Sequence, residues 1–217
     1  MKFKEAFKKF WHLLWEDDSL KGWLFAIIFL FIFIKLIFFP GLNFLTGTTR
    51  AMAIVESCSM YHQHNLFYTF DDWWKVHEAK YEKYTINDLD FKEFPFSNGF
   101  NKGDVLFFLK AKPEKLKIGD VITFESGDPT PIIHRIINIK QENGKYVFSI
   151  IGDNNYEQLK PPIFKVDESQ IDGNKVIGKT VFKIAPYVGW AKLIWFELAK
   201  KFDNDPNTNF EGLCNQN

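Results

Sequence analysis

The feature that most constrains this chain is a long apolar run close to its N-terminus. Residues 23–39 read WLFAIIFLFIFIKLIFF, which is 17 residues with a single charge at Lys35. As a helix with a rise of 1.5 Å per residue, the run would measure about 26 Å, close to the roughly 30 Å hydrocarbon core of a bilayer. Lys35 falls near its end, where a lysine stem can extend toward the headgroups. The run predicts a transmembrane helix over residues 22–40, ended by Pro40 and Gly41.

A cleaved signal peptide is the other explanation for such a run. The apolar part of a signal peptide usually spans ~7–15 residues and is followed by a cleavage site with small residues. The run here is longer and bulkier, and 22 residues precede it. We therefore expect a membrane helix that is retained.

The charges on either side of the run set its expected orientation. Several lysines precede it, whereas only Arg50 follows it closely. The positive-inside rule then places residues 1–21 in the cytoplasm and the chain beyond Pro40 outside. Within residues 1–21, aromatic and leucine residues recur at helical spacing with lysines between them. This pattern predicts either an amphipathic helix at the cytoplasmic membrane surface or a short helix packed on a partner.

The chain beyond the run is expected to be mainly β. Short segments rich in β-branched and aromatic residues are bounded by Gly, Asp, Asn or Pro, and ENGK at residues 142–145 is a hairpin turn signal. They predict a partly open antiparallel β-barrel-like domain over residues 41–190. Residues 62–100 differ, because they have helical spacing and few strand formers. We expect a partly helical insertion there, whose aromatic side chains either rest on the membrane or cover the barrel.

Composition excludes some classes of function. Lys+Arg and Asp+Glu both number 27, so no basic field points to nucleic acid. No metal or organic cofactor is expected, because no cluster of ligands with suitable spacing appears. Cys58 and Cys214 are too few for a disulfide scaffold, and either a pair or two unrelated thiols is consistent with the sequence. Residues 191–217 predict a C-terminal helix, too interrupted for a second span, and a loose tail.

A few polar residues could carry chemistry. A hydrolytic serine needs a base to take its proton and a group to orient that base. Ser57 and Ser59 lie in a turn after the first predicted strand. Of five histidines, only His134 lies inside a strand pattern, PIIHRII, where it needs a hydrogen-bond partner if buried. Asp153, in the stretch GDNN, follows another strand. Taken singly, His134 is explained as a structural histidine and Asp153 as part of an ordinary turn.

Taken together and in order, these segments form a more specific pattern. An apolar helix, ESCSMYH, GDVITF, IIHRI, GDNN and PYVG follow one another. The pattern resembles signal peptidase I of the archaeal and endoplasmic-reticulum type over roughly residues 22–190, without the insertion. That family reads Ser-Gly-Ser-Met-x-Pro after one N-terminal span, and has His-Arg where bacterial relatives have Lys-Arg. The resemblance implies a membrane-anchored serine endopeptidase that removes signal peptides after small residues, of the Ala-x-Ala type.

The resemblance also implies roles for particular residues. Ser59 matches the nucleophile, and Ser57 matches the serine whose hydroxyl helps the Ser59 amide form the oxyanion hole. His134 matches the general base, and Asp153 matches the aspartate of the Gly-Asp-Asn-Asn box. The implied partners are preprotein signal peptides, the lipid bilayer and the protein-translocation machinery.

The sequence departs from the family pattern at three positions. Cys58 replaces the glycine between the serines, and His62 replaces the proline after the methionine. Leu159 stands where the family often has the aspartate of a catalytic triad. The orienting acid is therefore Asp153, or Glu157 by substitution, or absent in a dyad. The competing hypothesis is a catalytically inactive, membrane-anchored β-domain that binds partners.

Overall fold

A computed structural model describes residues 2–63, 69–127 and 130–185 of the 217-residue chain, together with Gly189, Ile194 and Cys214. The chain forms two compact units, Met1–Gly47 and Thr48–Asn217. Most of the PYVG box and most of the expected C-terminal helix and tail lie outside the described residues.

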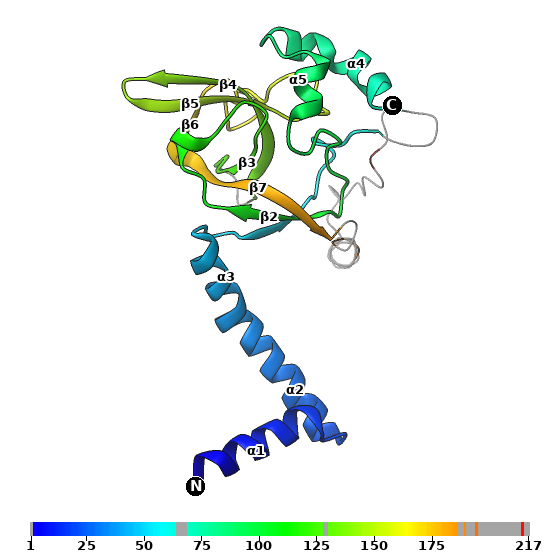
Figure 1. Ribbon diagram of the computed structural model, residues 1–217, viewed down its shortest axis with the longest axis vertical. Coiled ribbons are helices and arrows are strands. Elements are labelled where there is room, and N and C mark those ends of the chain that lie inside the picture. Colours follow the sequence, from blue (N-terminus) through cyan, green and yellow to red (C-terminus); the bar gives the residue numbers. More distant parts are fainter. Residues whose placement is uncertain are drawn as a thin grey trace. The chain divides into compact units, whose positions relative to one another are not determined.

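The first unit is helical. It comprises α1 (Lys2–Trp15), α2 (Leu20–Phe33), a π-helical turn η1 (Ile34–Phe38) and α3 (Phe39–Thr46), all drawn in blue in Figure 1. Phe10 of α1 packs edge-on against two phenylalanines of α2. The stretch Leu20–Thr46 has 27 residues, and an 18-residue window within it has a mean hydropathy of 2.6. By length and composition, it is the one helix in the described part of the chain that could cross a membrane.

The apolar helix does not end at Pro40, so this expectation was wrong. Pro40 lies in the first turn of α3, directly after η1. In that wider turn the Phe39 N–H reaches back five residues to the Ile34 carbonyl, and the altered bonding accommodates a proline that an unbroken α-helix would not. The helix continues to Thr46 and ends at Gly47, whose φ of 68° is the left-handed conformation typical of helix ends.

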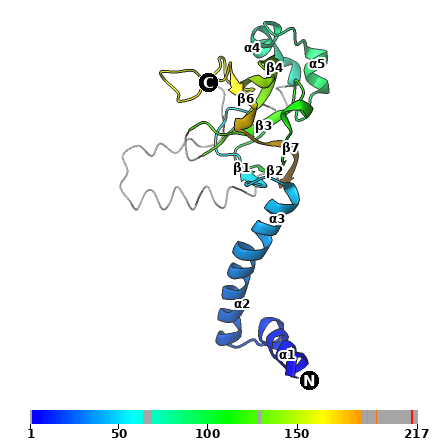
Figure 2. The ribbon, with the colours of Figure 1, turned by 90° about the vertical axis from the view of Figure 1, so that its left-hand side faces the viewer.

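The second unit is mainly β. The strands described in it form one antiparallel sheet in the order β1-β2-β7-β3-β4-β5-β6. Figures 1 and 2 show this sheet curled into a half-barrel, which confirms the expected partly open β-barrel-like domain. The strands are β1 (Met52–Ile54), β2 (Val105–Leu109), β3 (Val121–Phe124), β4 (Ile132–Glu142), β5 (Lys145–Ile151), β6 (Ile171–Asp172) and β7 (Val176–Ala185), with 3-10 turns η2 (Pro113–Lys115) and η3 (Gly173–Lys175).

The turn between β4 and β5 is the hairpin that ENGK predicts. Glu142 pairs with Lys145 across it, and both central residues have positive φ, 51° for Asn143 and 76° for Gly144. This geometry matches the right-handed twist of the strands.

The insertion forms two helices, α4 (Phe70–Glu82) and α5 (Asp88–Glu93), and each begins with a capping box. Figures 1 and 2 show them together beside β4. Their large aromatic side chains are buried against Ile137 of β4 and Ile151 of β5. The aromatic residues of these helices therefore cover the sheet. The buried set includes Trp73, Trp74, Tyr81 and Phe91.

Candidate active site

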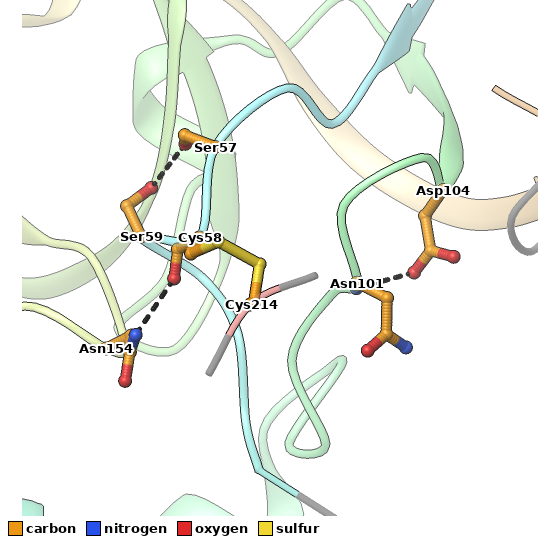
Figure 3. Close-up of a disulfide and its surroundings, with 7 residues drawn as sticks. All are labelled: Ser57, Cys58, Ser59, Asn101, Asp104, Asn154 and Cys214. Carbon is orange, nitrogen blue, oxygen red and sulfur yellow. Dashed lines mark hydrogen bonds between the residues drawn. A yellow bond between two sulfur atoms is a disulfide. The ribbon is translucent and has the colours of Figure 1, made fainter. Parts of the chain in front are cut away.

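The two serines lie in a tight turn that follows β1. The Oγ atoms of Ser57 and Ser59 are 3.2 Å apart (Figure 3). The Tyr61 N–H closes the turn by donating to the Cys58 carbonyl over 3.0 Å. Met60 is 2% exposed and packs in a core cluster with Val55. The buried methionine therefore fixes the turn to the domain, while Ser59 remains only half-buried.

His134 lies on β4, opposite Ile122 of β3, and is 1% exposed. Its Nδ1 is hydrogen-bonded to Oε1 of Glu168, a carboxylate that is fully buried. The other oxygen of Glu168 accepts the Leu159 N–H over 2.8 Å. Because a carboxylate only accepts, the proton of a neutral His134 lies on Nδ1 and its Nε2 carries a lone pair. This is the tautomer that a general base requires.

Ser59, His134 and Asn155 surround a single glycine. A Cβ added to Gly152 would lie 2.7 Å from the Ser59 carbonyl oxygen, 2.8 Å from His134 Nε2 and 2.8 Å from Asn155 Nδ2. Such distances exclude any side chain unless the neighbours move. Gly152 is therefore the point at which the serine turn, β4 and the loop after β5 meet.

Ser59 and His134 also line one pocket of about 570 Å³. Its wall is mostly apolar and comes from the end of β1, the start of β4 and the loop after β5. The other lining residues are Ile54, Val55, Glu56, Ser57, Met60, Phe100, Ser126, Thr130, Pro131, Ile132, Ile133, Asn155 and Leu159.

Asp153 binds a different partner from the one expected. Its carboxylate accepts from Arg135 Nε over 2.8 Å and from Nη2 over 2.6 Å. It also binds Tyr81 Oη at 3.0 Å and His62 Nε2 at 2.9 Å. Burial alone would raise the pKa of Asp153, but the Arg135 charge and the hydrogen bonds from His62 and Arg135 hold that pKa well below its usual range.

The geometry therefore corrects the expected pairing of Asp153 with His134. Arg135 follows His134 in β4, and side chains alternate between the two faces of a strand. Asp153 lies on the Arg135 side, so its carboxylate cannot orient the imidazole. Glu157, the alternative candidate, is exposed and lines a separate depression beside α4.

Glu168 is a site residue that no local sequence pattern indicates. It reaches the site because the chain after β5 doubles back. The Ile150 N–H donates to the Glu168 carbonyl, and the Glu168 N–H donates to the Leu159 carbonyl, both over 2.9 Å. No sequence signal distinguishes Glu168 from the adjacent Asp167, which instead caps a turn at Ser169.

The departures at Cys58 and His62 are accommodated. The non-glycine residues with positive φ in the described part of the chain are Thr85, Phe96 and Asn143, so Cys58 needs no glycine-like conformation. Its sulfur is bonded to that of Cys214, with the Cα atoms 5.5 Å apart (Figure 3). His62 is buried, and its ring stacks on Trp73 at 3.7 Å. Burial also lowers the pKa of His62, so it is a neutral donor to Asp153.

A serine and a histidine lining one pocket, with a buried carboxylate on the far imidazole nitrogen, are the side chains that serine hydrolases use. No family model matches the chain. Its sequence is nevertheless similar to curated catalytic subunits of the signal peptidase complex. It is 29% identical to SEC11C of Homo sapiens over 103 residues, which cover 46% of this chain and 53% of that protein.

Two fungal proteins named as the SEC11 catalytic subunit give the same result. The identity is 29% for Lodderomyces elongisporus and 27% for Candida tropicalis, each over 97 residues that cover 44% of this chain and 57% of the relative. The chain thus spans about half the length of the curated relatives it matches. This similarity supports a general relationship of the chain to the signal peptidase family.

Proposed function

We propose that this protein is a membrane-anchored serine endopeptidase that removes N-terminal signal peptides from secreted preproteins after small residues. The observation that carries the proposal is the convergence of Ser59 and His134 Nε2 on Gly152, with Glu168 on the other imidazole nitrogen. The similarity to curated catalytic subunits supports the substrate class.

The site supplies each group that acyl transfer needs. His134 Nε2 takes the proton of Ser59 Oγ, and the oxygen attacks the scissile carbonyl to form a tetrahedral intermediate. His134 gives that proton to the leaving amine, so that the C–N bond breaks and an acyl-enzyme remains. His134 then takes a proton from a water that attacks the ester, and returns that proton to Ser59 Oγ as the acyl group is released. Glu168 holds the ring in the required tautomer and stabilises the imidazolium that forms. Ser57 Oγ and the Ser59 N–H stabilise the oxyanion, and such donors are typically worth about 3–4 kcal/mol each.

The substrate binds as an extended strand in this proposal. β1 is the first strand in the sheet order and pairs with β2 on one side, so its other edge can accept a peptide strand. Apolar pocket residues then contact the small side chains that precede the cleaved bond. They are Ile54 at the end of β1, and Ile132 and Ile133 at the start of β4.

The proposed topology places the N-terminus in the cytoplasm and the β unit outside. Only residues 47–51 separate α3 from β1, so the serine turn follows the apolar helix closely in sequence. The Cys58–Cys214 disulfide supports this topology, because disulfides persist in oxidising compartments outside the cytosol.

The test is cleavage of a preprotein whose signal ends in Ala-x-Ala, by the purified full chain in detergent or liposomes. We expect the parent to cleave it and Ser59→Ala and His134→Gln to lose cleavage. Ser97→Ala, in the turn after α5 and outside the pocket lining, serves as the matched control and should remain active. If the parent, shown to be folded by circular dichroism, does not cleave, the proposal is wrong and a partner-binding β-domain becomes the better hypothesis.

A further inference from the structure

A buried lysine of the insertion contacts the loop that carries Gly152. Lys80 lies on α4 and is 8% exposed. Its Nζ is 2.5 Å from the Asp153 carbonyl oxygen, 2.7 Å from that of Asn155 and 3.3 Å from that of Gly152. An ammonium has three N–H donors, so all of them can be directed at this one loop.

The same loop holds the serine turn from its other side. The Asn154 N–H donates to the Ser59 carbonyl over 2.8 Å. The Asn154 side chain donates to the Cys58 carbonyl over 3.1 Å, as Figure 3 shows. The Asp153 N–H points to Met60 Sδ at 3.4 Å. The loop therefore lies between α4 and the nucleophile, with carbonyls directed at Lys80 and donors directed at the serine turn.

The loop needs a donor on its α4 side. β5 ends at Ile151, so strand pairing does not satisfy these carbonyls. The Asn155 N–H reaches the Gly152 carbonyl over 3.0 Å, but the Asp153 and Asn155 carbonyls converge on Lys80 Nζ. Buried carbonyls without a donor cost free energy, and hydrogen bonds to a charged group are worth more than neutral ones. Removing Lys80 would let the loop relax away from its present position.

We propose that Lys80 is a positioning residue for the Ser59–His134 site, acting through the loop of residues 152–155. This inference rests on the proposed function and deepens it. It makes the insertion of residues 62–100 a structural part of the active site, because α4 supplies the N–H donors that hold the loop. A shift of Gly152 would change the spacing between the Ser59 backbone and His134 Nε2, which both lie against the space that a Cβ at Gly152 would fill.

The test compares Lys80→Met with Lys83→Met in the full chain in detergent. Methionine has a similar length and no donors, and Lys83 is the exposed lysine just after α4. For Lys80→Met we expect kcat to fall about tenfold or more with KM within about twofold, since leaving a buried carbonyl without its donor is worth roughly that factor. Lys83→Met should match the parent. A Lys80→Met variant that also matches the parent would overturn the inference.

A second measurement does not need activity. Hydrogen exchange of the Asn154 amide should be about tenfold faster in Lys80→Met, whereas the amide of Ile136, which donates to Asp120 within the sheet, should be unchanged. Equal Asn154 exchange in Lys80→Met and Lys83→Met would refute the role of Lys80, even if the parent cleaves no preprotein and the proposed function itself fails. If Lys80→Met loses protection throughout the sheet, Lys80→Arg decides, because arginine keeps N–H donors at this position. Restored Asn154 protection supports the inference, and unrestored protection overturns it.

Discussion

His134 and Arg135 are consecutive residues of β4, and their side chains bind two different buried carboxylates. His134 is hydrogen-bonded to Glu168 on one face of the strand, and Arg135 is paired with Asp153 on the other. Strand alternation explains this separation. Glu168 therefore belongs to the candidate site, whereas Asp153 belongs to the packing of α4 against the sheet.

Glu168→Gln should therefore abolish most activity without unfolding the protein. The glutamine keeps the size and one of the two acceptor oxygens, but loses the charge that stabilises an imidazolium at His134. We expect kcat to fall about a hundredfold or more, the range associated with general-base catalysis. The measurement is preprotein cleavage by the folded variant.

Glu157→Gln is the matched control, because Glu157 is exposed and lines a separate depression. It should retain the parental kcat. If Glu157→Gln were the inactive variant and Glu168→Gln the active one, the assignment of the orienting acid would be wrong.

Asp153→Asn should mainly lower the free energy of unfolding. It leaves the fully buried Arg135 without its counter-charge, and breaking a buried pair in this way costs about 3–5 kcal/mol. The folded-state pKa of Asp153 lies well below the ordinary value of 3.8, so its contribution is present above that value and is lost as pH falls toward the folded pKa.

Denaturant unfolding between about pH 7 and about pH 3, a range that spans the ordinary pKa of carboxyl groups, measures this difference. The parent should lose stability more steeply than Asp153→Asn at the acid end. Parallel curves for the two proteins would contradict the prediction.

The sequence predicts the fold better than it predicts the site. The strands, the ENGK turn and the helical insertion follow from local signals such as residue alternation, turn residues and helical spacing. The end of the apolar helix does not, because Pro40 is normally a helix terminator and a π-helical turn overrides that preference.

The acid beside His134 depends on a long-range contact. Glu168 lies 34 residues from His134 in sequence, in a loop whose path is set by backbone bonds to Ile150 and Leu159. No periodicity or turn signal encodes that path. Once His134 is placed in the pocket, the alternation of side chains along β4 puts Arg135 on the other face. The pairing of Asp153 with Arg135 could therefore have been inferred.

Gly152→Ala should abolish the proposed cleavage activity by steric displacement. The new methyl group would lie 2.8 Å from His134 Nε2 and 2.7 Å from the Ser59 carbonyl oxygen, which are distances that atoms cannot keep. We expect kcat to fall about a hundredfold, as expected when reacting groups are displaced by about 1 Å. Gly41→Ala, where a Cβ meets nothing within 4 Å, is the control and should keep its kcat. An active Gly152→Ala variant would show that the site tolerates separation of these groups.

Loss of the Cys58–Cys214 disulfide should weaken both stability and cleavage. The bond joins the residue between Ser57 and Ser59 to a cysteine 156 positions away, and native disulfides typically contribute roughly 2–5 kcal/mol. We expect reductant to lower the melting temperature and kcat of the parent together, and to have no effect on the double variant Cys58→Ser/Cys214→Ser. If reductant changes neither property in the parent, the bond does not support the serine turn.

The pH dependence of stability should reveal the burial of Lys80. Burial lowers its pKa from 10.5 to about 7, with Asp153 opposing the shift and Arg135 adding to it. Between these two values the unfolded chain retains the Lys80 proton while the folded protein releases it. Stability relative to Lys80→Met should therefore rise with pH across this window, by up to about 1.4 kcal/mol per pH unit, and be lost as pH falls through about 7.

Urea unfolding of the full chain in mild detergent, followed by near-ultraviolet circular dichroism, measures this effect at several pH values. Lys83→Met should parallel the parent, because Lys83 is exposed. A constant difference between the parent and Lys80→Met from neutral to alkaline pH would mean that Lys80 keeps its proton throughout. In that case the carbonyls of the loop hold the ammonium more strongly than burial opposes it.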